Sequence, residues 1–166
     1  MHICERIALF FIIMRNETNK ILIGGKMADA VTSQTIYDAV GSKHAIMKFT
    51  NISDGNGESS VNKVDVSALS AGKDGTSCSK VDIEKIWYDI GGMRVDIEWN
   101  ATSNVKALVL GGSAAAGNVQ GHLNFSEFGG IKNTEASGYD GDIDFTTSGH
   151  TNLDHYTIVM KLKKTY

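Results

Sequence analysis

The chain has 166 residues, of which 42% are hydrophobic and 21% charged, so it is long enough for one domain with its own core and unlike a disordered or membrane protein. Its formal net charge is −3, whereas nucleic-acid binding needs a positive field. Eighteen glycines and no proline indicate that Gly, Asn, Asp and Ser make the turns, as between the strands of an all-β protein.

Residues 1–26 differ from the rest of the chain. Their apolar run, residues 7–14, is far shorter than the roughly 20 residues needed to span a bilayer, so we expect no membrane partner. Three interpretations remain open. The segment is a signal peptide, although Arg15 stands where small cleavage-site residues are needed; or Met27 is the natural start; or the segment is an arm that packs on a neighbour. We therefore divide the chain into an extension, residues 1–26, and a domain, residues 27–166.

The domain begins with three predicted strands, at residues 31–40, 45–50 and 61–66. Alternation places one set of apolar side chains on a dry face, namely Ala45, Met47, Phe49, Val64 and Val66. The same alternation predicts that Lys63 and Asp65 face water.

Residues 81–99 carry the clearest local pattern. Two apolar runs flank Gly91 and Gly92, and glycine tolerates the positive φ angles of a two-residue hairpin turn. The second run has a period of two, in which Met93, Val95, Ile97 and Trp99 alternate with Arg94, Asp96 and Glu98. We therefore predict a β-hairpin with one dry face and one wet, charged face.

The first arm of this predicted hairpin changes parity. Its apolar positions move from Val81 and Ile83 to Ile86, Tyr88 and Ile90, which predicts a β-bulge near Glu84 and Lys85. The shift leaves Trp87 on the face opposite Tyr88, either between two sheets or exposed to a partner. We expect Trp87 to be buried, because large aromatic side chains are mostly inside. Trp87 and Tyr88 are nonetheless the candidate interface residues.

Further strands are predicted at residues 105–110, 119–125, 142–147 and 156–162, with glycine-rich connections between them. No convincing amphipathic helix follows Met27. This series of strands and turns predicts an antiparallel β-sandwich, for which a jelly-roll-like arrangement is one option.

No catalytic or cofactor-binding motif is complete. Gly112-x-x-x-x-Gly117 lacks the Lys and the Ser or Thr that a phosphate-binding loop needs after its second glycine. The two cysteines, Cys4 and Cys78, lie far apart and form neither a disulfide framework nor a zinc pattern. We therefore expect no catalytic residues, no cofactor and no enzyme activity.

Two polar clusters have partial metal-ligand spacing. The carboxylates of Asp140, Asp142 and Asp144 match the first ligands of a calcium loop, but the glycine and glutamate that such a loop needs further on are missing. His150 and His155 lack an assured third ligand. We interpret Asp142 and Asp144 as the wet face of a strand and expect no metal site.

Several blocks together resemble a family of small virion structural proteins of tailed bacteriophages from marine sources. They are MKFTNISDGNGESSVNKVDVSAL at residues 47–69, IEKIWYDIGGMRVDIEW at 83–99, HLNFSEFGGIKN at 122–133, GDIDFTTSGH at 141–150 and DHYTIVMKLKKTY at 154–166. The resemblance covers most of residues 30–166 and none of residues 1–26. An alanine-rich insertion at residues 111–117 departs from the family pattern.

This resemblance implies a non-enzymatic component of the phage particle. We expect a capsid decoration or cement protein, made in the bacterial host cytoplasm, that binds the major capsid protein at the capsid surface and can self-associate as a homo-oligomer. The alternative is a tail-associated or fibre-associated module that binds host glycan, with Trp87, Tyr88 or Trp99 stacking on sugar. Aromatic exposure separates the two, because a glycan binder needs an open ring beside polar groups, whereas a clamp needs apolar patches at its periphery.

Overall fold

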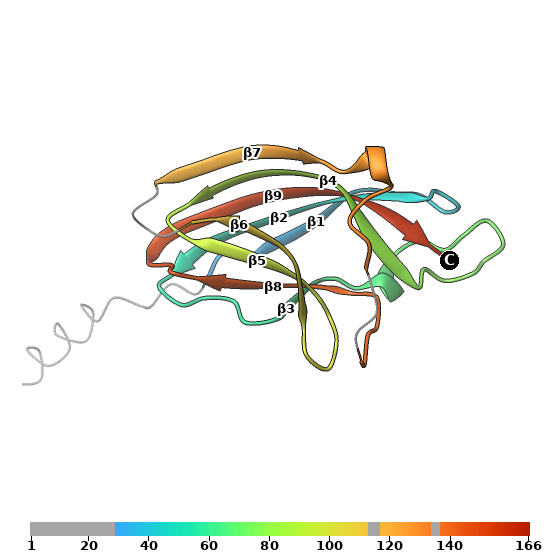
Figure 1. The fold of residues 1–166 in the computed structure, drawn as a ribbon, viewed down its shortest axis with the longest axis horizontal. Coiled ribbons are helices and arrows are strands. Elements are labelled where there is room, and N and C mark those ends of the chain that lie inside the picture. Colours follow the sequence, from blue (N-terminus) through green and yellow to red (C-terminus); the bar gives the residue numbers. More distant parts are fainter. Residues whose placement is uncertain (1–28, 113–116, 134–136) are drawn as a thin grey trace, which may run out of the picture.

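Two antiparallel β-sheets pack face to face in the computed structural model, which describes residues 29–112, 117–133 and 137–166 (Figure 1). The five-stranded sheet has the order β1 (Thr32–Asp38), β2 (His44–Asp54), β9 (Asn152–Thr165), β4 (Lys80–Gly91) and β7 (Asn118–Asn124). The four-stranded sheet has the order β3 (Val61–Val64), β8 (Ile143–Ser148), β5 (Arg94–Trp99) and β6 (Val105–Gly111). Two short 3-10 turns, η1 (Val66–Ala68) and η3 (Ser126–Phe128), lie in the connections.

Strand pairing follows the plan of a jelly roll. β2 pairs with β9, β3 with β8, β4 with β7 and β5 with β6, so the chain is one long hairpin, with its turn between β5 and β6, rolled into two sheets. β1 extends the five-stranded sheet at its edge. The predicted antiparallel β-sandwich is confirmed, and its arrangement is the jelly-roll-like option.

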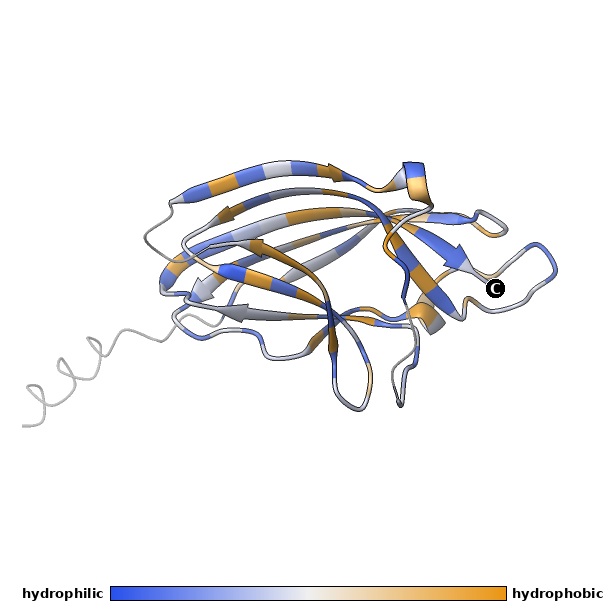
Figure 2. Ribbon diagram, viewed as in Figure 1, coloured by the Kyte–Doolittle hydropathy of each residue, from blue (hydrophilic) through white to orange (hydrophobic). Residues whose placement is uncertain are grey.

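The core lies between the two sheets, as period-two alternation predicts. Figure 2 shows hydrophobic and hydrophilic positions alternating along several strands of both sheets. On β2 the side chains of Ala45, Met47 and Phe49 point inward and are buried. The rings of Phe49, Phe145 and Tyr156 meet edge to face, which joins β2 and β9 to β8 of the other sheet.

The predicted β-bulge in β4 is confirmed. The register between β4 and β9 shifts between Ile83 and Lys85, so Glu84 is the extra residue. The bulge changes which side chains face the core, so that Ile83 and Ile86 are both fully buried.

The predicted hairpin at Gly91 and Gly92 is wrong, although both strands that flank it are present. β4 pairs with β7 and β9, whereas β5 pairs with β6 and β8, so the turn carries the chain from one sheet to the other. Of the two glycines, Gly92 alone has a positive φ, +77°, while a type I′ turn needs positive φ at both positions. Met93 follows directly and is buried in the core.

Glycine at position 92 also leaves room for a side chain of β9 that lies over it. A Cβ at this position would clash with the carboxylate of Asp154. We expect Gly92→Ala to lower the free energy of unfolding by about 2–3 kcal/mol, measured by urea denaturation, because it combines left-handed backbone strain with this clash.

Gly75→Ala is the matched control for Gly92→Ala. Gly75 has a similar φ, +82°, and open space around its Cβ position. In this variant, backbone strain alone should therefore lower the free energy of unfolding. Adding Asp154→Ala should restore part of the stability of Gly92→Ala. Equal losses at Gly92 and Gly75 would contradict the role of the Asp154 contact.

Asp96 and Glu98 on β5 are buried, whereas the sequence pattern places them on a wet face. Arg94 donates a hydrogen bond of 2.7 Å to Asp96, and Lys106 forms ion pairs with both carboxylates. The Thr146 hydroxyl donates a hydrogen bond of 2.8 Å to Glu98. Burial alone would raise the pKa of the Asp96 carboxyl, but Arg94 and Lys106 outweigh it and hold this pKa below its ordinary value.

Lys63 and Asp144 also depart from the predicted wet face. Lys63 is 5% exposed and forms a buried ion pair with Glu58, since a register shift in β3 turns its side chain inward. Asp144 is buried and accepts hydrogen bonds of 2.9 Å from the side-chain amides of Asn100 and Asn104. Strand periodicity therefore locates these positions on a face but does not show which face is covered.

The predicted extension, residues 1–26, lies outside the described residues, and so does residue range 113–116 of the alanine-rich insertion. In the portions that the structure describes, no helix is long and apolar enough to cross a membrane.

Candidate functional site

Trp87 lies on the outer face of the five-stranded sheet and is 40% exposed, so the prediction that it is buried is wrong. Its assignment to the face opposite Ile86 and Tyr88 is confirmed, because both of those side chains pack toward the core. The four-stranded sheet covers only the inner face of the five-stranded sheet. The outer face, which carries Trp87, is left uncovered among the described residues.

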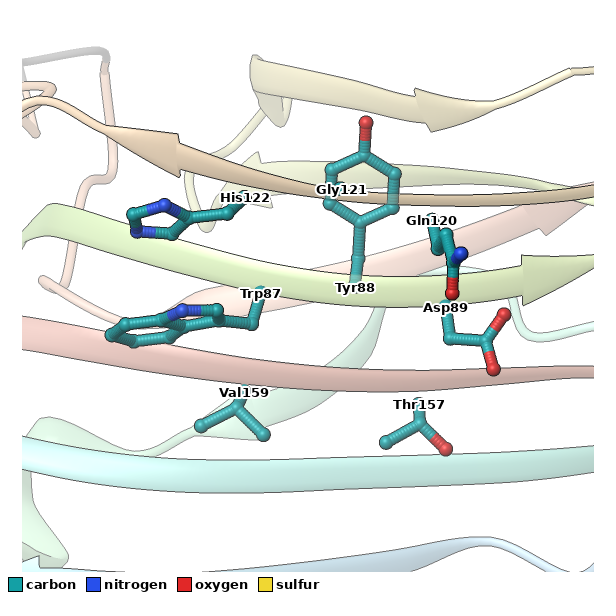
Figure 3. Close-up of a pocket in the computed structure, with 8 residues that line it drawn as sticks. All are labelled: Trp87, Tyr88, Asp89, Gln120, Gly121, His122, Thr157 and Val159. Atoms are coloured by element: carbon teal, nitrogen blue, oxygen red, sulfur yellow. The ribbon is translucent and has the colours of Figure 1, made fainter.

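The indole of Trp87 stacks on the imidazole of His122, which lies opposite it on β7 (Figure 3). The two ring centroids are 4.9 Å apart and the ring planes are 14° from parallel. On the other side of Trp87, Val159 of β9 occupies the same register position. These three side chains form a row of ring and methyl surface across three strands.

A second row, which is polar, runs beside the first. Asp89 of β4 lies opposite Gln120 of β7 and Thr157 of β9, two residues along the strands from Trp87. The two rows line an open hollow of about 470 Å³. The site therefore offers an exposed aromatic surface beside groups that both donate and accept hydrogen bonds.

Tyr88, the other candidate interface residue, is half-buried and packs against the core, and together with Gly121 it also lines the hollow beside Trp87. Figure 3 shows its ring crossing Gly121 of the edge strand, while Trp87 and His122 lie together on the outer face. A Cβ at Gly121 would be 2.6 Å from the Tyr88 hydroxyl oxygen, so the absence of a side chain makes room for this ring. Trp99, considered as a third sugar-stacking residue, is 2% exposed. Of the three candidates, Trp87 is exposed, Tyr88 is half-buried and Trp99 is buried.

The two rows continue across the rest of the five-stranded sheet. Beyond Val159 the first row continues with Lys48 and Gln34, and beyond Thr157 the second continues with Thr50 and Thr32. We call these ten positions the outer platform: Gln34, Lys48, Val159, Trp87 and His122 in the first row, and Thr32, Thr50, Thr157, Asp89 and Gln120 in the second.

Two further hollows lie along the outer platform. One, of about 270 Å³, is lined by Thr32, Gln34, Lys48 and Thr50, and the other, of about 400 Å³, joins Thr32 and Thr50 to Thr157. Because strands in a sheet are about 4.8 Å apart, four spacings from β7 to β1 amount to about 19 Å, the length of a short linear ligand.

A charged group borders the outer platform at the β4 bulge. The carboxylate of Glu84 lies 2.6 Å from the Lys161 amine and 3.5 Å from the His44 imidazole. Burial alone would raise the pKa of Glu84, but the hydrogen bond and charge of Lys161, together with the charges of His44 and Lys85, hold this pKa below its ordinary value. Glu84 therefore neutralises Lys161 next to the platform.

No group of three His, Cys, Asp or Glu side chains is arranged to hold a metal ion within the described ranges. His150 covers Gly57, and His155 lies over Gly91. Asp142 accepts hydrogen bonds from the Asn62 side chain and the Val66 backbone. The hydrogen bonds of Asp142 therefore join the segment before β8 to β3 and η1.

Sequence reasoning missed five members of the two rows beside Trp87, namely Asp89, Gln120, His122, Thr157 and Val159. Alternation in residues 119–125 already indicates that Gln120 and His122 point away from Val119 and Leu123. Nothing in that local pattern shows that β7 pairs with β4, and only this pairing brings His122 against Trp87.

Comparison with known proteins gives little further information. No family model matches the chain, and no curated protein matches it. Among solved structures, it is similar to a mutant of a carbohydrate-binding module of family 29, with 11% identity and a TM-score of 0.30 over 81% of this chain and 92% of that one. It is also similar to a mutant module of that family in complex with mannohexaose, with 10% identity and a TM-score of 0.27 over 81% and 92% of the two chains. At such low TM-scores, nothing about the site is transferred from these modules.

Proposed function

We propose that this protein is a non-enzymatic binding module whose outer platform binds a glycan. The observation that carries the proposal is the open Trp87 ring, stacked on His122 and bordered by the polar row. Sugar rings present C–H groups on their faces and hydroxyl groups at their edges. An aromatic surface with a few fixed polar groups beside it complements both features.

Each part of the outer platform has a role in this proposal. The part of the Trp87 indole that His122 leaves uncovered packs on the apolar face of one sugar ring. His122 holds the indole in its orientation by stacking on it. Asp89 accepts hydrogen bonds from sugar hydroxyl groups, and Gln120 both donates and accepts them. Because these residues lie on paired strands, their spacing is set before the ligand arrives, which lowers the entropy lost on binding.

The hollow beside Trp87 supports binding better than hydrolysis. Asp89 is the single carboxylate among its lining residues. Most glycosidases, by contrast, use a pair of carboxylates on either side of the scissile bond.

Trp87→Ala tests the proposal. Burying an aromatic side chain contributes about 1.5–3 kcal/mol, so we expect the variant to bind its glycan about 10-fold to 100-fold more weakly. The measurement is binding of the purified full chain to a printed array of neutral and acidic oligosaccharides, followed by calorimetry on the strongest hit.

Phe128→Ala is the matched control, because Phe128 is an exposed aromatic residue on η3, outside the outer platform. Its binding should equal that of the wild type, and Trp87→Phe should retain part of the affinity. Unchanged binding in a folded Trp87→Ala protein would contradict the proposal.

A second candidate function, capsid decoration, is favoured by a different observation. β1 is an edge strand whose outer side is unpaired among the described residues, and four apolar side chains on or beside it are exposed: Val31, Ile36, Tyr37 and Val40. Its one charged residue, Asp38, forms a buried ion pair with Lys164, so no charge protects this edge. Such an edge suits strand addition by a neighbouring protein, for which we propose the major capsid protein of a phage.

Copy number in purified phage particles tests this second candidate. Many copies per particle would support a place on the head lattice, and a few copies would support the tail. Absence from washed particles would contradict both virion locations and leave glycan binding as a separate question.

A further inference from the structure

Two lysines that form no ion pair within the part of the chain that the structure describes lie near Trp87 on the outer face. Lys85 lies two residues before Trp87 on the same face of β4, about 7 Å along the strand. Lys48 lies in the row of Trp87, two strands away, about 10 Å from it. Both side chains are half-buried, and neither forms an ion pair with a carboxylate of the described residues.

The neighbouring lysine on β9, Lys161, does have a carboxylate partner. Lys161, opposite Lys85 on β9, is neutralised by Glu84, which His44 also approaches. On the far side of Trp87 the polar row carries one carboxylate, that of Asp89. One side of Trp87 therefore has two amines that form no ion pair within the described residues, although the charge of Lys85 also acts on Glu84. The opposite side has hydrogen-bonding groups.

We propose that the glycan is anionic, a polysaccharide whose carboxylate or sulfate groups are bound by Lys48 and Lys85 while one of its sugar rings stacks on Trp87. This inference rests on the proposed function and adds the charge of the ligand to it. Half-buried amines next to a ring-covered surface are partly shielded from water, which strengthens their attraction for an anionic group.

The net charge of the chain, −3, is compatible with an anionic ligand. At physiological ionic strength the screening length is about 8 Å, so a bound polymer responds mainly to charges next to it. Three of the acidic side chains, those of Asp96, Glu98 and Asp144, belong to the four-stranded sheet, on the other side of the core. Next to Trp87, the charges that form no ion pair within the described residues are those of Lys48, Lys85 and Asp89, two positive and one negative.

The test compares three immobilised polysaccharides by biolayer interferometry: polygalacturonate for carboxylate groups, carrageenan for sulfate groups and glucomannan as the neutral polymer. We expect the wild type to bind at least one acidic polymer more tightly than the neutral one. Lys48→Gln and Lys85→Gln should each weaken that binding about threefold to tenfold. Raising NaCl from about 0.05 M to about 0.5 M should weaken it as well.

Lys73→Gln is the matched control, since it removes the same charge from an exposed lysine of the loop before β4. It should bind as the wild type does, and thermal melts confirm that all variants are folded. If the wild type binds glucomannan as tightly as the acidic polymers, if this binding depends on Trp87, and if neither lysine variant changes it, the proposal of an anionic ligand is overturned. The proposed glycan-binding function is then left intact. Acidic binding that survives Trp87→Ala, or no binding to any polymer, would overturn both.

Discussion

Replacing Lys63 by methionine is expected to lower the free energy of unfolding by about 3–5 kcal/mol, measured by urea denaturation at neutral pH. Lys63 and Glu58 are both buried, and their ion pair lies near the rings of Phe145 and Tyr156. Without the ammonium group, the Glu58 carboxylate keeps the Tyr156 hydroxyl, which donates a hydrogen bond of 2.7 Å to it, but loses its counter-charge. A buried charge without its partner is costly, which makes this a large effect.

Tyr156 cannot take over the role of Lys63 as a positive partner. Burial, and then the negative charge of Glu58, raise the pKa of the Tyr156 hydroxyl well above its ordinary value, so this group stays protonated and neutral. It stabilises the Glu58 carboxylate as a hydrogen-bond donor alone.

The double variant Lys63→Met with Glu58→Gln is the informative control for this pair. Removing both charges should regain at least half of the lost stability, because an uncharged pair does not require a counter-ion. Lys43→Met, at an exposed lysine, should stay within about 0.5 kcal/mol of the wild type. Equal losses in the single and double variants would show that the loss comes from packing and not from the unpaired charge.

Replacing Phe145 by alanine is expected to lower the free energy of unfolding by a similar amount, about 3–5 kcal/mol. Phe145 is fully buried on β8, with ring centroids 5.3 Å from Phe49 of β2 and 5.9 Å from Tyr156 of β9. The change removes the ring that joins the two sheets and leaves a cavity that rigid strands on both sides cannot close. Urea denaturation with a global fit of the midpoint and slope measures the loss.

Phe128→Ala controls for the removal of a phenylalanine as such. Phe128 is 67% exposed, so its loss should change stability by no more than about 0.5 kcal/mol. Phe145→Leu, which keeps more of the volume, should fall between the wild type and Phe145→Ala. A loss below about 1 kcal/mol for Phe145→Ala would contradict a central role for the aromatic contact between the sheets.

Local pattern was sufficient for the strands and for the bulge. Alternation predicted the inward positions of β2, and the parity change in β4 predicted the irregularity at Glu84. It also assigned Trp87 to the face opposite Tyr88. Such information is available from sequence because a strand has a fixed period of two along the chain.

Pairing and burial required the tertiary structure. Gly91 and Gly92 suit a hairpin as well as a crossover, and the crossover forms because β4 and β5 find their partners in β7, β9, β6 and β8, far along the chain. The same lack of long-range information explains why Lys63 and Asp96 were expected in water.

The sequence by itself thus determined an antiparallel β-sandwich, the positions of its strands and which side chains share a face. Only the tertiary structure decided which of those faces is covered, and so left Trp87 open and placed His122, Asp89 and Lys48 around it. The physical reason is that alternation is set by neighbouring residues along one strand, whereas a site on a sheet is made by residues from different strands. Their hydrogen-bonded register depends on how the whole chain rolls up.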